Sequence, residues 1–167
     1  MARDYVRPQN LTGLVIVAST RASQGIYEDR SGPLAVDWLR SQGFETPDAL
    51  IIADSHVKAY FAQLVAEGNL PSIILTSGGT GLNSDDQTVE AVRPHLDKEI
   101  PGIMHAFWSY SMDKVPHAVL SRGVAGVIGK TFVMTLPGSR GGVKDGVSVL
   151  EPLIDHICRQ LEDYHDH

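Results

Sequence analysis

Hydrophobic positions along the 167-residue chain fall into two kinds of run. Continuous apolar, β-branched runs predict strands that are buried on both faces. They occupy residues 13–19, 49–52, 72–76 and 131–136. Apolar residues at three- and four-residue spacing predict helices over residues 31–43, 55–68, 88–96 and 147–164. Residues 101–121 are expected to be helical in pieces, with a break at Pro116.

The order of these elements predicts the fold class. Strands that alternate with helices through short connections are typical of an α/β protein with a parallel sheet covered on both faces. Ser31 and Ser55 are the expected N-caps of the first two helices. We expect a polar N-terminal arm over residues 1–10, one domain over 11–164 and a tail over 165–167. The histidines of that tail, His165 and His167, could bind a metal or simply belong to a frayed polar end.

Composition and charge narrow the function classes. Hydrophobic residues make up 43% and charged residues 20%, which are ordinary globular values. The net charge of −6 argues against nucleic acid as a partner, since phosphate backbones are bound by clustered Lys and Arg. The longest apolar run, Leu14 to Ala18, is far too short to cross a membrane, so we expect a soluble protein. A lone Cys158 and a start without a long apolar segment predict a cytoplasmic location. Cys158 is expected to be a packed small residue rather than a nucleophile.

Three loops that follow predicted strands could carry chemistry, because ligands of open α/β sheets bind at the carboxyl ends of the strands. The loop over residues 20–32 offers Arg21, Ser23 and Ser31 before a helix, although it could be an ordinary solvated loop. The turn Ser77-Gly-Gly-Thr-Gly81 leaves backbone N–H groups uncovered, and such a turn can wrap a phosphate. It matches neither the dinucleotide fingerprint nor the P-loop. The loop over residues 136–146 carries Arg140 and Lys144 and suits an anion or a plain surface turn.

Carboxylates accompany two of these strand ends. Asp85 and Asp86 follow the glycine-rich turn at the start of a predicted helix. They could complement the helix dipole, or one of them could hold Mg²⁺, which is commonly bound by one or two carboxylates together with substrate phosphates. Asp54 occupies the matching position after the second strand, where by itself it would be an alternative N-cap to Ser55.

Five motifs follow one another over nearly the whole chain, from about Leu11 to the final helix. They are Thr20-Arg-Ala-Ser-Gln-Gly25 with Asp29-Arg-Ser-Gly-Pro33, Thr76-Ser-Gly-Gly-Thr-Gly81 followed by Asp86 and Glu90-Ala91, Pro101-Gly102, Leu120-Ser-Arg122 with Val124-Ala-Gly126, and Leu136-Pro-Gly-Ser139. In this order they resemble the Mog and MoaB-like family of molybdenum cofactor biosynthesis, which also supplies the G domain of gephyrin-type proteins.

The resemblance implies a three-layer α/β/α fold with a mostly parallel central sheet, assembled as a homotrimer or hexamer. It implies a molybdopterin adenylyltransferase, which transfers AMP from ATP to the molybdopterin phosphate with Mg²⁺ and releases pyrophosphate. Handover of the product to a molybdenum insertion protein would follow.

The same resemblance assigns roles to residues of this chain. The two proposed catalytic and metal-binding aspartates of the family fall on Asp54 and Asp86. The expected substrate-binding residues are the glycine-rich turn, the third loop and part of the first: Thr76, Ser77, Gly78, Gly79, Thr80, Gly81, Pro137, Gly138, Ser139, Arg21, Ser23 and Ser31.

The chain departs from the family pattern in two places. His105 and Trp108 stand where the family usually has Glu and Arg, and Asp85 stands where it usually has Arg. An extra carboxylate beside a phosphate site repels the phosphate unless a cation lies between them. These departures favour an alternative, a non-catalytic molybdopterin carrier or scaffold. A third hypothesis is a structural or regulatory module that uses the fold only for oligomerisation, with Ile103, Met104, Phe107 and Trp108 either at a subunit interface or on a buried helix face.

Overall fold

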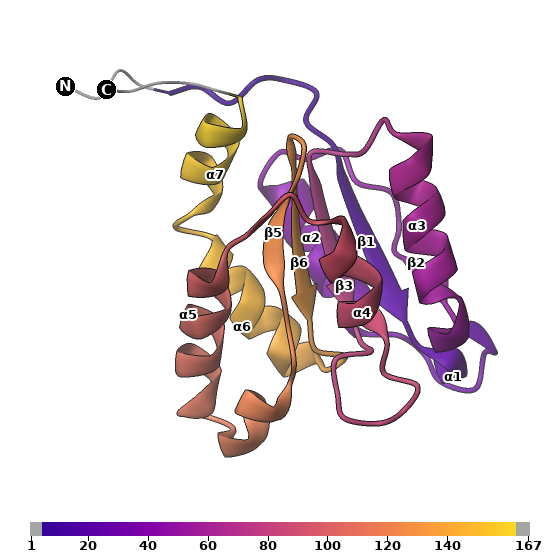
Figure 1. Ribbon diagram of the computed structural model, residues 1–167. Coiled ribbons are helices and arrows are strands. Elements are labelled where there is room, and N and C mark those ends of the chain that lie inside the picture. The colour runs from indigo at the N-terminus through magenta and orange to yellow at the C-terminus, as the bar shows by residue number, and fades with distance from the viewer. Residues whose placement is uncertain (1–4, 163–167) are drawn as a thin grey trace.

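The computed structural model describes residues 5–162, so the tail over 165–167 and its histidines lie outside the described residues. The centre of the molecule is a six-stranded sheet in the order β2-β1-β3-β6-β5-β4 (Figure 1). The strands are β1 (Gly13–Ala18), β2 (Leu50–Ile52), β3 (Ile73–Ser77), β4 (Lys98–Glu99), β5 (Ala125–Ile128) and β6 (Thr131–Leu136). Strands β1, β2, β3 and β6 are parallel, whereas β5 is antiparallel to both β6 and β4.

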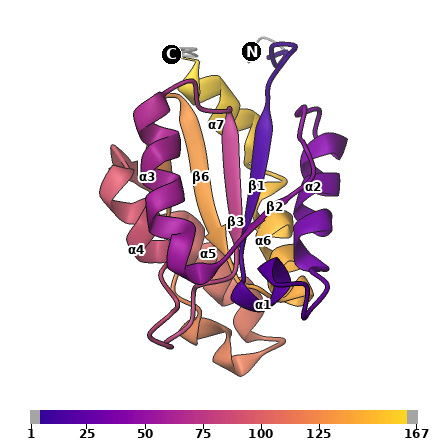
Figure 2. The same cartoon turned by 90° about the vertical axis from the view of Figure 1, so that its right-hand side faces the viewer.

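Helices cover both faces of this sheet (Figure 2). They are α1 (Thr20–Ser23), α2 (Ser31–Ser41), α3 (Val57–Glu67), α4 (Thr88–Val92), α5 (Pro101–Met112), α6 (Arg140–Leu150) and α7 (Ile154–Leu161), with 3-10 turns η1 (Asp54–His56), η2 (Arg93–His95) and η3 (Pro116–Leu120). Helices α2, α5, α6 and α7 pack on one face, and α3 and α4 pack on the other. The expected three-layer α/β/α architecture with a mostly parallel sheet is confirmed.

The continuous apolar runs are explained by this double coverage. Along β1, Val15 and Val17 belong to the core beneath α2 and α6, while Ile16 and Ala18 belong to the core beneath α3 and α4. All four are almost fully buried, and burying one Val or Ile side chain stabilises the fold by about 1.5–3 kcal/mol. No helix in residues 5–162 is long and apolar enough to cross a membrane.

The sequence analysis missed the strands β4 and β5. Strand β5 is short, begins with Ala125-Gly126 and returns to β6 through the turn Gly129-Lys130, where Gly129 has a φ of +57°. Its glycine content made it resemble a loop. Gly126 is required there because a Cβ atom would overlap the carbonyl oxygen of Lys98 on β4.

The prediction for the C-terminal helix was also wrong. The predicted loop over 136–146 is largely the first part of α6, which begins at Arg140, and α7 is a separate helix after Pro152. Ser139 caps α6 by accepting a hydrogen bond from the N–H of Gly142 at 3.0 Å. Gly146 lies so close to β6 that a Cβ atom would overlap Leu136. Its presence in the helix therefore reflects close packing rather than a turn.

Candidate functional site

The strand order places a topological switch point at the carboxyl end of β1, because β2 and β3 lie on opposite sides of that strand. The loops after β1, β2, β3 and β6 all leave the sheet at this edge, which is the lower edge in Figure 1. Most of the residues that the sequence analysis singled out lie in these loops.

The turn after β3 has the backbone of an anion-binding site. Gly78 and Gly79 have φ values of +92° and +68°, a region that favours glycine. Gly78 donates its N–H to the carbonyl of Leu136 at 3.0 Å, and a Cβ atom on it would overlap the carbonyl oxygen of Ala18. In the described part of the chain, the N–H groups of Gly79, Thr80 and Gly81 have no hydrogen-bond acceptor. Gly79 and Thr80 are buried, and buried N–H groups are normally satisfied by a protein acceptor, an ordered water or a ligand oxygen.

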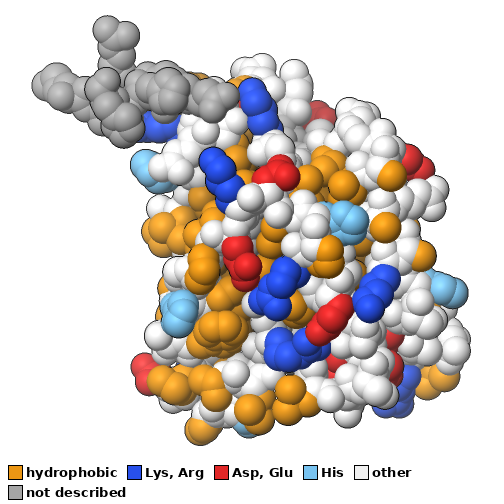
Figure 3. All heavy atoms as spheres, in the orientation of Figure 1, with side chains coloured by type: hydrophobic (Ala, Val, Ile, Leu, Met, Phe, Trp, Pro, Cys, Tyr) orange, Lys and Arg blue, Asp and Glu red, His pale blue; other side chains and the backbone are white. Residues whose placement is uncertain are grey.

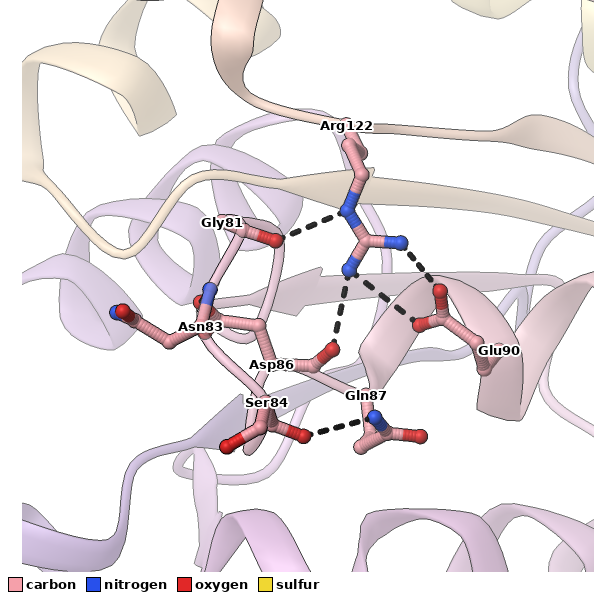
Figure 4. Close-up of polar contacts among 7 residues, drawn as sticks. All are labelled: Gly81, Asn83, Ser84, Asp86, Gln87, Glu90 and Arg122. Atoms are coloured by element: carbon pink, nitrogen blue, oxygen red, sulfur yellow. Dashed lines mark hydrogen bonds and ion pairs between the residues drawn. The ribbon is translucent and has the colours of Figure 1, made fainter.

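Arg122 holds the next part of this loop in place (Figure 4). Its Nε donates to the carbonyl of Gly81 at 2.9 Å, its Nη2 donates to the carbonyl of Asp86 at 3.0 Å, and its guanidinium forms an ion pair with Glu90. The hydrogen bond from Arg122 lowers the pKa of the Glu90 carboxyl below its ordinary value. One side chain just before β5 thus fixes both ends of residues 81–86.

The departures from the family pattern have definite places in this arrangement. Trp108 donates its Nε1–H to the carbonyl of Ser121 at 2.8 Å and meets the His105 ring edge-on, with 5.7 Å between the ring centroids. The hydroxyl of Ser121 in turn contacts the Thr80 hydroxyl at 2.8 Å. Trp108 therefore supports the glycine-rich turn through Ser121. Asp85 is exposed on the surface of the same loop.

A chain of hydroxyl contacts joins the other loops. The Ser31 and Ser77 hydroxyls lie 2.9 Å apart, and Ser77 donates to the carbonyl of Pro137 at 3.0 Å. Ser31 is not the N-cap of α2, because the Asp29 carboxylate accepts the N–H groups of both Ser31 and Gly32. The same carboxylate accepts the Ser31 hydroxyl at 2.9 Å. These contacts bring the loops after β1, β3 and β6 together at one point.

The two candidate catalytic aspartates flank the loop after β1, since Asp54 follows β2 and Asp86 follows β3. Asp54 Oδ2 accepts both the N–H and the hydroxyl of Thr20, at 3.0 and 2.9 Å. Asp86 Oδ2 accepts the N–H of Asn83 at 3.0 Å. Within residues 5–162, Oδ1 of each aspartate has no hydrogen-bond donor, and no three acidic, His or Cys side chains are grouped as metal ligands.

A cavity of about 560 Å³ opens beside the glycine-rich turn, between the loop after β3, the end of α5, η3 and the start of α6. It is lined by Gly81, Leu82, Asn83, Phe107, Ser111, Lys114, Val115, His117, Ala118, Leu120, Ser121, Pro137, Ser139, Gly141, Gly142 and Asp145. Leu82, Val115 and Leu120 are exposed at its rim, and Figure 3 shows hydrophobic side chains along this lower edge of the molecule.

The predicted site residues divide between the cavity and its surroundings. Gly81, Pro137 and Ser139 line the cavity, while Gly138 packs against Gly78 beside it. Thr76 lies inside the sheet, is 1% exposed and is not among the residues that line the cavity. Arg21 and Ser23 lie on α1 within the loop after β1 and are not among the residues that line the cavity.

Sequence reasoning missed the charged pair in the cavity. Asp145 on α6 is 9% exposed, accepts the Ser111 hydroxyl at 2.7 Å and pairs with Lys114 Nζ at 2.9 Å. The hydrogen bond to Asp145 raises the pKa of the Lys114 amino group. Asp145 was placed in a predicted loop, so its burial was not foreseen. The N-cap signal of Ser139 followed by a helical stretch could have found it.

Comparisons with known proteins agree with this fold. The family described as "Probable molybdopterin binding domain" matches residues 14–156. A protein of Pyrococcus furiosus named molybdopterin adenylyltransferase is 32% identical over 154 residues, which are 89% of this chain and 90% of that protein. The solved structure of the molybdopterin biosynthesis Mog protein from Mycobacterium ulcerans is 40% identical, with a TM-score of 0.83, over 90% of this chain and 99% of that one.

Some relatives are much longer than this chain. Gephyrin from Dictyostelium discoideum is 33% identical over 152 residues, which are 85% of this chain but 21% of gephyrin. The chain likewise spans about half the length of two bifunctional proteins of molybdenum cofactor biosynthesis, from Synechococcus elongatus and Chlorobaculum tepidum. The family match over residues 14–156 shows that the chain belongs to the molybdopterin-binding domain family, which includes the Mog and MoaB proteins of molybdenum cofactor biosynthesis.

Proposed function

We propose that this protein is a molybdopterin adenylyltransferase, which transfers AMP from ATP to the molybdopterin phosphate and releases pyrophosphate. The observation that carries the proposal is the row of N–H groups at Gly79, Thr80 and Gly81, which lack acceptors within residues 5–162 and end at Gly81, on the wall of a cavity of about 560 Å³. The name of the Pyrococcus furiosus relative supports the same reaction.

The glycine-rich turn is suited to phosphate oxygens. Backbone N–H groups that point outward from consecutive turn residues form an anion-binding concavity without any basic side chain. This explains how a chain with a net charge of −6 can take phosphorylated substrates. In phosphoryl-group transfer the protein mainly positions the reactants and stabilises developing charge, and fixed backbone dipoles do both.

Asp54 and Asp86 fit a magnesium ion that arrives with ATP. One oxygen of Asp54 is held by Thr20 of the loop after β1, and one oxygen of Asp86 is held by Asn83 of its own loop. The other oxygen of each carboxylate has no donor in the described part of the chain. Mg²⁺ is usually bound through one or two carboxylates together with water and substrate phosphates, so two carboxylates are sufficient. When bound, the ion neutralises charge on the phosphates of ATP. Asp54 and Asp86 would hold it, and the carboxylate of Asp86 lies nearer the glycine-rich turn along the chain.

The cavity suits the pterin part of the substrate. Its volume lies within the usual range for small-molecule sites, and its walls are apolar apart from a few polar groups. Ser139 and the first N–H groups of α6 lie at its edge, where a helix N-terminus stabilises negative charge. We assign molybdopterin to this cavity and ATP to the glycine-rich turn.

The test measures pyrophosphate release from ATP, Mg²⁺ and molybdopterin. We expect turnover by the unmodified protein and a loss of at least about 100-fold in Asp86→Ala, with pterin affinity unchanged. Asp37→Ala, an exposed carboxylate on α2 away from the cavity, is the matched control and should keep full activity. A folded protein without turnover would overturn the proposal, and an active Asp86→Ala variant would remove Asp86 from the metal site.

A second candidate is a molybdopterin carrier without catalysis, and the position of Asp85 favours it. Its exposed carboxylate lies on the loop that follows the glycine-rich turn, where it repels a polyphosphate through partly screened space. Calorimetry distinguishes the two candidates. Tight binding of ATP with Mg²⁺ supports the enzyme, whereas pterin binding without nucleotide binding supports the carrier.

We further propose that the protein works in the cytoplasm as a homotrimer, with a hexamer as the alternative, and passes its product to a molybdenum insertion protein. These proposals rest on the resemblance to the family. Light scattering on the purified protein would measure the mass of the assembly against the 18.1 kDa chain.

A further inference from the structure

The cavity contains one deeply placed carboxylate. Asp145 is 9% exposed, and 12% of its side chain is accessible, yet it lines the cavity. Its Oδ2 accepts the hydroxyl of Ser111, and its Oδ1 accepts Lys114 Nζ. Among the lining residues, Asp145 is the acidic side chain, and Lys114 is the lysine that pairs with it.

The carboxylate of Asp145 has hydrogen-bonding capacity to spare. An ionised carboxylate offers about four lone-pair positions, and the described contacts use two of them. Ser111 is buried and fixed on α5, whereas 54% of the Lys114 side chain is exposed and its amino group ends a flexible chain. Oδ2 is therefore held rigidly, while the partner of Oδ1 can be replaced at little cost.

A ligand with two adjacent N–H donors would match this carboxylate. Two parallel N–H to oxygen bonds to a charged carboxylate are among the strongest and most geometrically selective contacts in proteins. The 2-amino group and the N3–H of a pterin ring form such a pair of donors. The corresponding edge of a 2-oxo ring places a carbonyl oxygen against the carboxylate, which is repulsive.

We propose that Asp145 is the specificity residue that recognises the 2-amino, N3–H edge of the pterin ring. Lys114 gives up Oδ1 when the ring enters and keeps its amino group at the mouth of the cavity. This inference rests on the proposed function in one respect, that the ligand of the cavity is a pterin. It gives Asp145 a role beyond its ion pair with Lys114, which follows the end of α5.

Binding of two small fluorescent probes, pterin and its 2-oxo analogue lumazine, tests the proposal without ATP or Mg²⁺. The unmodified protein should bind pterin about 10- to 100-fold more tightly than lumazine, as expected for hydrogen bonds to a charged group. In Asp145→Asn the preference should fall to less than about threefold, because an amide cannot accept both donors. Asp113→Asn, an exposed carboxylate at the end of α5, is the matched control and should keep the preference.

Each outcome decides the question. Equal binding of pterin and lumazine by the unmodified protein, or no pterin binding, would overturn the proposal even if Asp145→Asn did not fold. A preference that persists in a folded Asp145→Asn variant would reduce Asp145 to a structural role. The assay is independent of pyrophosphate release, so an inactive protein that discriminates the two probes would disprove the proposed reaction but not this inference.

Discussion

Single residues at the carboxyl edge of the sheet decide whether the loops can approach one another. Gly78 is the clearest case, since its φ of +92° and its contact with the Ala18 carbonyl leave no room for a side chain. The N–H of Gly78 also holds the turn against β6 through the carbonyl of Leu136. A side chain here would therefore strain the backbone and separate two strands.

We expect Gly78→Ala to lower the free energy of unfolding by about 2–4 kcal/mol, through backbone strain and steric overlap. Gly102→Ala is the control, because Gly102 lies in the first turn of α5 and a Cβ atom there meets nothing. That change should be neutral or stabilise the protein by up to about 1 kcal/mol. Urea unfolding of the two variants measures the difference, and equal effects would refute the argument.

For single residues, the sequence predicts backbone conformation better than it predicts which residues a side chain will contact. The glycines of the turn after β3 could be recognised from their spacing, and Asp54 and Asp86 from their places after strands. The partners of Ser31, Ser77 and Asp145 could not, because each contact joins residues more than 30 positions apart. Such contacts depend on how the elements pack, and local propensity says nothing about that.

Among the elements, the loop between β3 and α4 depends on a strand that comes later in the chain. Arg122, just before β5, binds two carbonyls of this loop and the side chain of Glu90 on α4. About one third of each side chain in the ion pair is exposed, so the pair is partly screened by water. Its contribution should be modest in energy but important for the order of the loop.

We expect Glu90→Gln to destabilise the protein by about 0.2–1 kcal/mol at neutral pH. The pKa of Glu90 is lowered in the folded state, so the stabilisation is present above the ordinary pKa of a Glu side chain, about 4.3, and is lost as the pH falls through the lowered value. Unfolding measured at pH 7 and again below pH 4 should therefore show the difference from the unmodified protein shrinking. Glu99→Gln, in a more exposed pair at 3.4 Å, should change less. A difference independent of pH would contradict the pairing.

The elements that the sequence predicts correctly are those with strong periodicity. The four parallel strands and the helices α2 and α3 are confirmed at nearly the predicted bounds. Strands β4 and β5 were missed because two- and four-residue strands leave almost no periodicity. Their pairing is antiparallel, β5 with β6 and β4 with β5. Helix α6 was missed in part because three glycines within it suggested a loop.

At the scale of the whole molecule, the reactivity of the Cys158 thiol reports on unfolding of the protein. It lies in the core on α7 and is 7% exposed, and burial raises the pKa of its thiol to about 11. The thiolate is the reactive form, so the folded protein should react with a thiol reagent at pH 8 at least about 100-fold more slowly than the chain in concentrated urea. Absorbance of the released reagent measures both rates. Rapid reaction of the folded protein would show that α7 opens independently of the core.

The two ends of the described chain meet on the side away from the cavity. The hydroxyl of Tyr5 donates to the Glu162 carboxylate at 3.0 Å, and α7 lies at the opposite edge of the sheet from the glycine-rich turn (Figure 1). A second domain joined to residue 5 or 162 would therefore be attached on the side away from the cavity. A domain of this family can therefore be part of a much longer polypeptide, such as gephyrin, while the mouth of the cavity still faces the solvent.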